Sequence, residues 1–108
     1  MQPDYIIYIL EAVEGMGATR ARKMFGGWGI FCNDLMFGLV ADGILYLKVD
    51  KKNQHTFEEL SLEPFGYKKN GKKFTMSYFQ TPDTAMENPK ELLEWSQRSY
   101  QAAVRCKK

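Results

Sequence analysis

Residues 20–50 read RARKMFGGWGIFCNDLMFGLVADGILYLKVD, and this stretch decides the fold. Two turn dipeptides, Asn33-Asp34 and Asp42-Gly43, divide it into runs of apolar and aromatic residues that are typical of β-strands. Asp-Gly between such runs is a strong signal for a two-residue hairpin turn, and Asn-Asp is a weaker signal of the same kind. The stretch therefore predicts three consecutive antiparallel strands.

A helix is predicted before these strands. The segment that begins at Pro3 and Asp4 carries apolar residues at helical spacing, and Gly15 and Gly17 end it. These apolar residues are Ile6, Ile9, Leu10 and Val13.

The second half of the chain predicts a short helix, a hairpin and a long helix. Asp50 can cap a helix over residues 51–60. Asn70-Gly71 is the strongest short-range hairpin signal, so we expect two strands within residues 63–80. Asn88 as N-cap, with Pro89 and Glu91 after it, starts the last helix. Its predicted buried side consists of Leu92, Leu93, Ser96, Tyr100, Ala103 and Val104.

The predicted order over residues 1–108 is helix, three strands, helix, two strands, helix. Because the strands within each group are joined by hairpins, the sheet should be antiparallel. We therefore expect one α+β domain, a two-layer sandwich in which helices pack on one face of a five-stranded sheet. A chain of 108 residues is long enough to fold in this way without metal or disulfide support.

Composition excludes several classes of protein. The net charge of +2, from 15 basic and 13 acidic residues, lacks the strong excess of a dedicated nucleic-acid-binding domain. No apolar run approaches the ~18 residues of a membrane span, and the start lacks the basic region of a secretory signal. Cys32 and Cys106 are far apart and read as reduced thiols. We expect a cytoplasmic protein that does not contact a membrane.

Three glycines surround a tryptophan in the segment Gly26-Gly27-Trp28-Gly29. Their spacing matches neither phosphate-binding motif, GxGxxG or GxxxxGK[ST], and they lead into β-prone residues. We therefore interpret them as a backbone bend or bulge in preference to a phosphate site. Trp28 is interpreted as a core residue in preference to an exposed contact residue.

No set of residues predicts catalysis. His55 is the only histidine and lies in a short polar helix, so we expect it to face solvent. Glu58 and Glu59 are adjacent and point to different sides of a helix, while Asp42 and Asp50 fit turn and cap roles. We expect no catalytic residue, cofactor or metal ion.

Lysines cluster around the Asn70-Gly71 turn. They could bind nucleic-acid phosphates, with Tyr67 and Phe74 available for stacking, or they could keep the sheet edge from pairing with other chains. We favour the second reading. The candidate nucleic-acid residues are Lys68, Lys69, Lys72 and Lys73, with Arg20, Arg22 and Lys23 as additions.

Five ordered blocks carry a family resemblance. They resemble, over about Ile9 to Ala103, the N-terminal domain of the TfoX/Sxy family of bacterial competence regulators. The blocks are RKMFGGWGIF at 22–31, LYLKVD at 45–50, EPFGY at 63–67, MSYF at 76–79 and ELLEW at 91–95. The resemblance implies the same order of helices and strands, and a fold similar to that of type III secretion chaperones, which bind proteins and commonly dimerise.

The resemblance also implies a function. Characterised members of this family switch on DNA-uptake genes together with the cyclic-AMP receptor protein, and many carry a second domain similar to helix-hairpin-helix DNA-binding modules. We expect residues 1–108 to be the single-domain form. We expect a non-enzymatic regulatory module that contacts a protein, for example the cyclic-AMP receptor protein. The alternative is direct nucleic-acid binding through the Lys68–Lys73 hairpin.

The strands contain more apolar residues than one buried face needs, which predicts a partner surface. The residues assigned to it are Gly26, Gly27, Trp28, Gly29 and Phe37. A symmetric homodimer with Trp28 or Phe37 near its interface is one expectation. The alternative is a monomer in which the first and last helices cover both faces of a curved sheet.

Overall fold

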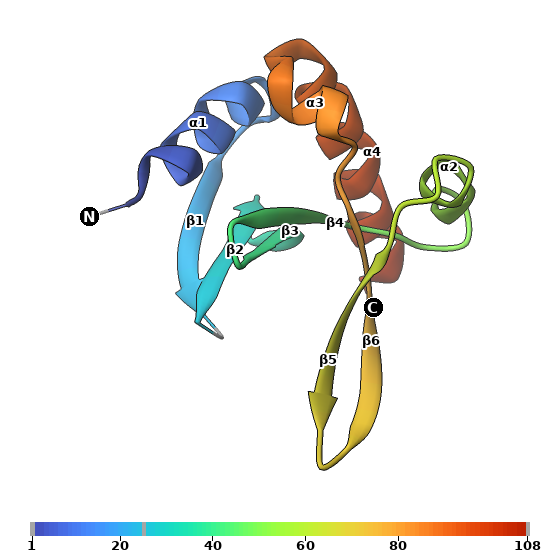
Figure 1. The fold of residues 1–108 in the computed structure, drawn as a ribbon. Helices are drawn as coiled ribbons and strands as arrows, with labels where there is room; N and C mark the ends of the chain where they lie inside the picture. Colours follow the sequence, from blue (N-terminus) through green and yellow to red (C-terminus); the bar gives the residue numbers. More distant parts are fainter. Residues whose placement is uncertain (1, 25, 108) are drawn as a thin grey trace.

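Six antiparallel strands form one sheet in the order β1-β2-β3-β4-β6-β5 (Figure 1). The computed structural model describes residues 2–24 and 26–107, apart from the side chains of residues 67–69, 73 and 74. The strands are β1 (Thr19–Met24), β2 (Gly27–Cys32), β3 (Leu35–Ala41), β4 (Ile44–Lys48), β5 (Pro64–Lys69) and β6 (Lys72–Gln80). The helices are α1 (Asp4–Val13), the 3₁₀ turn η1 (Glu14–Met16), α2 (Gln54–Glu58), α3 (Asp83–Glu87) and α4 (Pro89–Cys106). The predicted α+β class is confirmed.

All three predicted turn dipeptides form two-residue hairpin turns. Both central residues have positive φ in each turn: 48° and 65° in Asn33-Asp34, 51° and 75° in Asp42-Gly43, and 53° and 77° in Asn70-Gly71. This is the type I′ geometry, whose twist matches that of the adjoining strands. The turn residues therefore set the connections β2–β3, β3–β4 and β5–β6.

The expected strand count of five is wrong by one. Residues 20–32, predicted as a single strand, form the antiparallel pair β1 and β2, in which Met24 pairs with Gly27. Only two residues link these strands, and one of them, Gly26, has φ +74°. Phe-Gly is not among the common hairpin dipeptides, so the sequence carried no familiar signal for this turn. Phe25 lies outside the described residues.

The helices match the predictions at both ends of the chain and differ between them. The Asn88 side chain accepts hydrogen bonds from the backbone N–H groups of Lys90 and Glu91, so the predicted cap of α4 is confirmed. α2 is shorter than predicted, because Asp50 caps the turn that precedes it. α3 was not predicted. In the part of the chain that the structure describes, no helix is long and apolar enough to cross a membrane.

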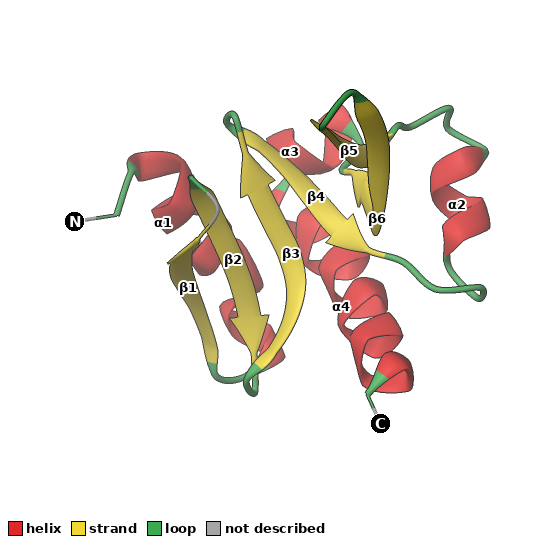
Figure 2. Cartoon of the chain, turned by 90° about the horizontal axis from the view of Figure 1, so that it is seen from below, coloured by secondary structure: helices red, strands yellow, loops and turns green. Residues whose placement is uncertain are grey.

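The core lies between the sheet and the helices, which pack on one face. In Figure 2 the strands β2 to β4 lie in front of α3 and α4. Leu47 of β4 and Leu92 of α4 are fully buried there, and the ring of Phe57 packs edge-on against Trp95 with centroids 4.9 Å apart. On α4, Val104 was predicted to be buried but is 40% exposed, whereas Trp95, which was not predicted, is buried.

A bulge changes the direction of side chains in β3. The β2–β3 register shifts between Ile30 and Phe31, whose partners are Gly38 and Met36, so that Phe37 has no partner. Such an extra residue breaks the strict alternation of a strand. Phe37 joins the core cluster and is 1% exposed, whereas Met36 shares a face with Phe31.

Candidate functional site

The face of the sheet opposite the helices carries an apolar centre that no helix covers, and we call it the open face (Figure 2). Alternation along each strand separates its residues from the core: Ala21, Ile30, Leu45 and Leu47 belong to the core or pack on it, so their strand neighbours point the other way. The register, with the ring contact between Tyr46 and Phe65, then places residues of all six strands on this face. The open face consists of Arg20, Arg22, Met24, Gly29, Phe31, Met36, Leu39, Tyr46, Lys48, Phe65 and Tyr78.

Two methionines and a phenylalanine meet over Gly29 at the centre of the open face. A Cβ added at Gly29 would lie 2.6 Å from the Met24 sulfur, 2.9 Å from the Met36 sulfur and 2.9 Å from an edge carbon of Phe31. Glycine therefore leaves the space that these three side chains share. Thioether side chains have flexible torsions and adapt to different contacts, so this centre can repack against a partner.

Cations cover aromatic rings on both sides of this centre. The Arg20 guanidinium lies 5.1 Å from the Phe31 ring centroid and also pairs with Asp34 at 3.1 Å. The Lys48 ammonium lies 5.2 Å from the Tyr78 ring and donates to the Ser77 hydroxyl at 2.7 Å. Both cations are held in place by these contacts, which are worth roughly 0.5–1 kcal/mol each at exposed sites.

Charge is divided between the sheet and the rest of the molecule. The six strands, as the structure bounds them, contain eight of the 15 Lys and Arg residues and none of the 13 Asp and Glu residues. The acidic residues lie in helices, turns and loops instead. The strands therefore present a cationic surface although the net charge of the chain is only +2.

The predicted partner residues have different positions. Gly26 forms the β1–β2 turn, and Gly27 lies against the backbone of Val40, where a Cβ would overlap the carbonyl oxygen. Gly26 lies in a bend of the backbone, as predicted, whereas Gly27 and Gly29 are paired residues of β2 that allow close packing. Trp28 is half-buried against the core, and Phe37 is inside the core of a single chain, so Phe37 is not on an accessible surface.

The candidate nucleic-acid residues lie in two places. Arg22 and Lys23 are exposed neighbours in β1, and they point to opposite faces because Arg22 pairs with Gly29 and Lys23 with Trp28. The backbone pairs Lys68 with Lys73 and Lys69 with Lys72 at the hairpin. Lys72 is exposed, and the side chains of the other three hairpin lysines are outside the described residues.

The described residues contain no group of three His, Cys, Asp or Glu side chains that could hold a metal ion. His55 is exposed, and burial raises the pKa of the Cys32 thiol, which disfavours a reactive thiolate. Hydrogen bonding to Arg105 lowers the pKa of Asp50 to about 2, and this carboxylate ties the end of α4 to the segment before α2. Asp50 therefore has a structural role.

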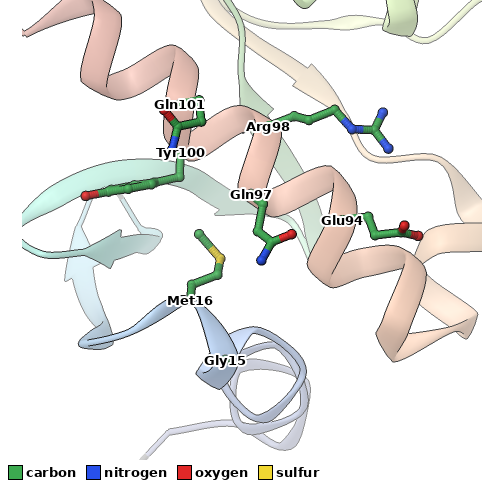
Figure 3. Close-up of a pocket in the computed structure, with 7 residues that line it drawn as sticks. All are labelled: Gly15, Met16, Glu94, Gln97, Arg98, Tyr100 and Gln101. Atoms are coloured by element: carbon green, nitrogen blue, oxygen red, sulfur yellow. The ribbon is translucent and has the colours of Figure 1, made fainter.

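Several grooves lie away from the open face, and two of them lie between helical and neighbouring segments. The first, of about 440 Å³, runs between η1 and the side of α4, where Met16 faces Gln97 and Tyr100 (Figure 3). The second, of about 680 Å³, lies between α2 and β6 and carries Glu58 and Glu63. Both grooves carry glutamates, Glu94 in the first and Glu58 and Glu63 in the second, and no described histidine or cysteine lines either of them.

The α+β fold, with its antiparallel sheet, glycine-rich strand β2 and long capped helix α4, has the order of elements that the sequence resemblance implied, apart from the additional strand and α3. Residues 11–103 match the TfoX N-terminal domain, and the chain belongs to that family. It is 36% identical over 89 residues to the DNA transformation protein TfoX1 of Aliivibrio fischeri (strain ATCC 700601 / ES114), which covers 82% of this chain and 43% of that protein. It is 27% identical over 97 residues to Protein Sxy of Escherichia coli (strain K12), which covers 90% and 46%. The chain thus spans less than half the length of these two relatives.

Sequence reasoning found only part of the open face: it counted Met24, Phe31, Met36 and Leu39 as surplus apolar residues of the strands but did not assign them to the site. It assigned neither Leu39 nor Tyr46 to a site, and it treated Arg20 only as an addition to the lysine hairpin. The signal that could have found them is the alternation of β4, ILYLK, which separates Tyr46 and Lys48 from the core leucines. Because residues 20–32 were predicted as one strand, the alternation that places Arg20 and Arg22 on the same face of β1 was not recognised.

Proposed function

We propose that this domain is a non-enzymatic regulatory module that acts by contact with a protein partner. The observation that supports the proposal is the open face, an adaptable apolar centre between cations. The described residues also hold no group of metal ligands. Rigid sheets with an apolar, uncovered face are suited to binding another surface.

The process that we propose is the regulation of DNA uptake. One relative is named a DNA transformation protein, and the TfoX N-terminal domain family covers residues 11–103 of this chain. The partner that we favour is a transcriptional regulator such as the cyclic-AMP receptor protein. In this view the domain contributes a docking surface, and the partner contributes sequence-specific DNA recognition.

Deleting the gene and measuring transcripts of DNA-uptake genes tests this role. We expect the transcripts to fall on deletion under competence-inducing or carbon-limited growth and to return when the chain is supplied again. Purification of the tagged chain from the same cells should recover a transcriptional regulator. Unchanged transcripts together with recovery of no component of the transcription machinery would refute the proposal.

A second candidate function is direct nucleic-acid binding, which the concentration of Lys and Arg on the strands favours. If the four hairpin lysines neutralise four phosphates, log affinity should fall against log salt with a slope of about −3.6 for duplex DNA. A salt titration with duplex and single-stranded DNA measures this slope. Absence of binding at ~50 mM salt, or binding that Lys72→Ala together with Lys73→Ala leaves unchanged, would exclude this function.

A further inference from the structure

We infer that the open face binds an amphipathic helix of a protein partner whose apolar stripe is flanked by carboxylates. The inference rests on the proposed function, because it assumes a protein partner, and it adds the chemistry of the segment that docks. Three features carry it: the spacing of the cations, their lack of acidic partners on the sheet, and the nature of the apolar centre.

The spacing of the cations fits a helix. Arg20 and Arg22 lie on β1, Lys48 lies on β4, and the apolar centre lies mainly on β2 and β3 between them. β1 and β4 are three strand spacings apart, which is roughly 14 Å. An α-helix with its side chains is about 10–12 Å wide, so one helix can lie between the two cationic strands. Its apolar stripe would then contact the half-buried side chains of Met24 and Met36.

The charges specify what the helix carries on its flanks. Arg22 is exposed and makes no ion pair with any described residue. Among the described residues, only Asp34 forms an ion pair with a cation of this face. Carboxylates on a docking helix would pair with Arg22 and approach Lys48, which gives charge complementarity across the interface. A second copy that presents the same face would bring cations against cations, so the charges oppose a face-to-face homodimer.

The apolar centre favours a protein segment over a nucleic acid. Stacking of bases requires open ring faces, yet Arg20 covers Phe31 and Lys48 covers Tyr78, which is only 6% exposed. Tyr46 and Phe65 contact each other edge-on, with centroids 4.9 Å apart and an interplanar angle of 68°. The accessible remainder of the centre consists of the half-buried Met24 and Met36, whose flexible side chains suit the aliphatic residues of a helix.

A designed peptide tests this inference on the isolated chain. The probe is a helical peptide of about 18 residues with leucines along one stripe and glutamates on both flanks, and its control replaces every glutamate by lysine. Binding is followed by amide NMR shifts at roughly 50 mM salt, where ion pairs are least screened. We expect saturable shifts at Arg22, Gly29, Leu39 and Tyr46 with the acidic peptide and none with the basic one.

Neighbouring cations on opposite faces supply matched variants. Arg22→Glu should weaken binding of the acidic peptide about tenfold, Arg22→Ala less, and Lys23→Glu should leave it within about twofold. The amide spectrum of each free variant shows whether its fold is intact. Equal losses for Arg22→Glu and Lys23→Glu would mean non-specific attraction and would overturn the inference.

Other occupants of the face give different results. Shifts confined to the open face that depend on protein concentration alone would show self-association. Tighter binding of a twelve-residue oligothymidine at the same residues would show a nucleic-acid site, and no saturable binding of the acidic peptide would show that the face does not take such a helix. Each result overturns this inference. Transcript levels after gene deletion test the proposed function separately, so either can fail alone.

Discussion

Replacing Gly27 by alanine should destabilise the fold far more than replacing its neighbour Gly26. A Cβ at Gly27 would overlap the carbonyl oxygen of Val40 and lie 3.1 Å from its carbonyl carbon, so that β2 and β3 must separate. Overpacking costs about 1–3 kcal/mol even where side chains can adjust, and here the obstacle is backbone. We therefore expect a loss of at least about 3 kcal/mol. At roughly 4–8 °C per kcal/mol for a small domain, the Tm should fall by more than about 12 °C.

Gly26 provides the matched control. Its φ is +74°, and an added Cβ would meet no described atom within 4 Å, so Gly26→Ala carries only the cost of left-handed backbone. That cost is about 1 kcal/mol. Thermal melts of both variants, followed by circular dichroism, give the comparison. Equal and small losses for the two variants would refute the reasoning, because they would show that β2 does not approach Val40 as closely as described.

Three further predictions concern other contacts. Asp50→Asn should lower the free energy of unfolding by up to about 1 kcal/mol at pH 7, since the ion pair with Arg105 is partly exposed. Folding lowers the pKa of Asp50 from 3.8 to about 2, so urea titrations should show the difference between wild type and variant disappearing as the pH falls through that interval. Burial raises the pKa of Tyr78 from 10.0 to about 12, so the stabilisation of the fold by the neutral Tyr78 hydroxyl should be present below pH 10 and lost as the pH rises toward 12. Tyr78→Phe should remove a step near pH 12 in an ultraviolet titration of the protein. Trp95→Ala should cost about 3–5 kcal/mol through loss of its packing on Phe57, whereas retained stability in urea would show that α4 is held elsewhere.

Local turn chemistry made most of the fold predictable. Asn33-Asp34, Asp42-Gly43 and Asn70-Gly71 each place residues that tolerate positive φ at both central positions, and each forms the expected turn. The cap at Asn88 was predictable for a similar reason, because a short polar side chain there can accept from the first free N–H groups of α4.

Features that depend on long-range contacts were not predictable. The role of Gly27 comes from Val40, which lies in a different strand. The inward position of Phe37 comes from a register shift that alternation does not reveal. Counting apolar residues indicated a partner surface, but only the register shows that Leu39 and Tyr46 belong to the open face while Ile30 belongs to the core.

The central claim is that this domain regulates through contacts of the open face. The most direct measurement is the level of DNA-uptake transcripts in cells whose chromosomal gene carries Arg22→Glu or Lys23→Glu, with the amounts of both proteins matched by immunoblot. These substitutions make the same charge change at adjacent exposed residues that point to opposite faces. We expect Lys23→Glu to match the wild type and Arg22→Glu to match the deletion. Wild-type transcript levels in the Arg22→Glu strain would contradict the account.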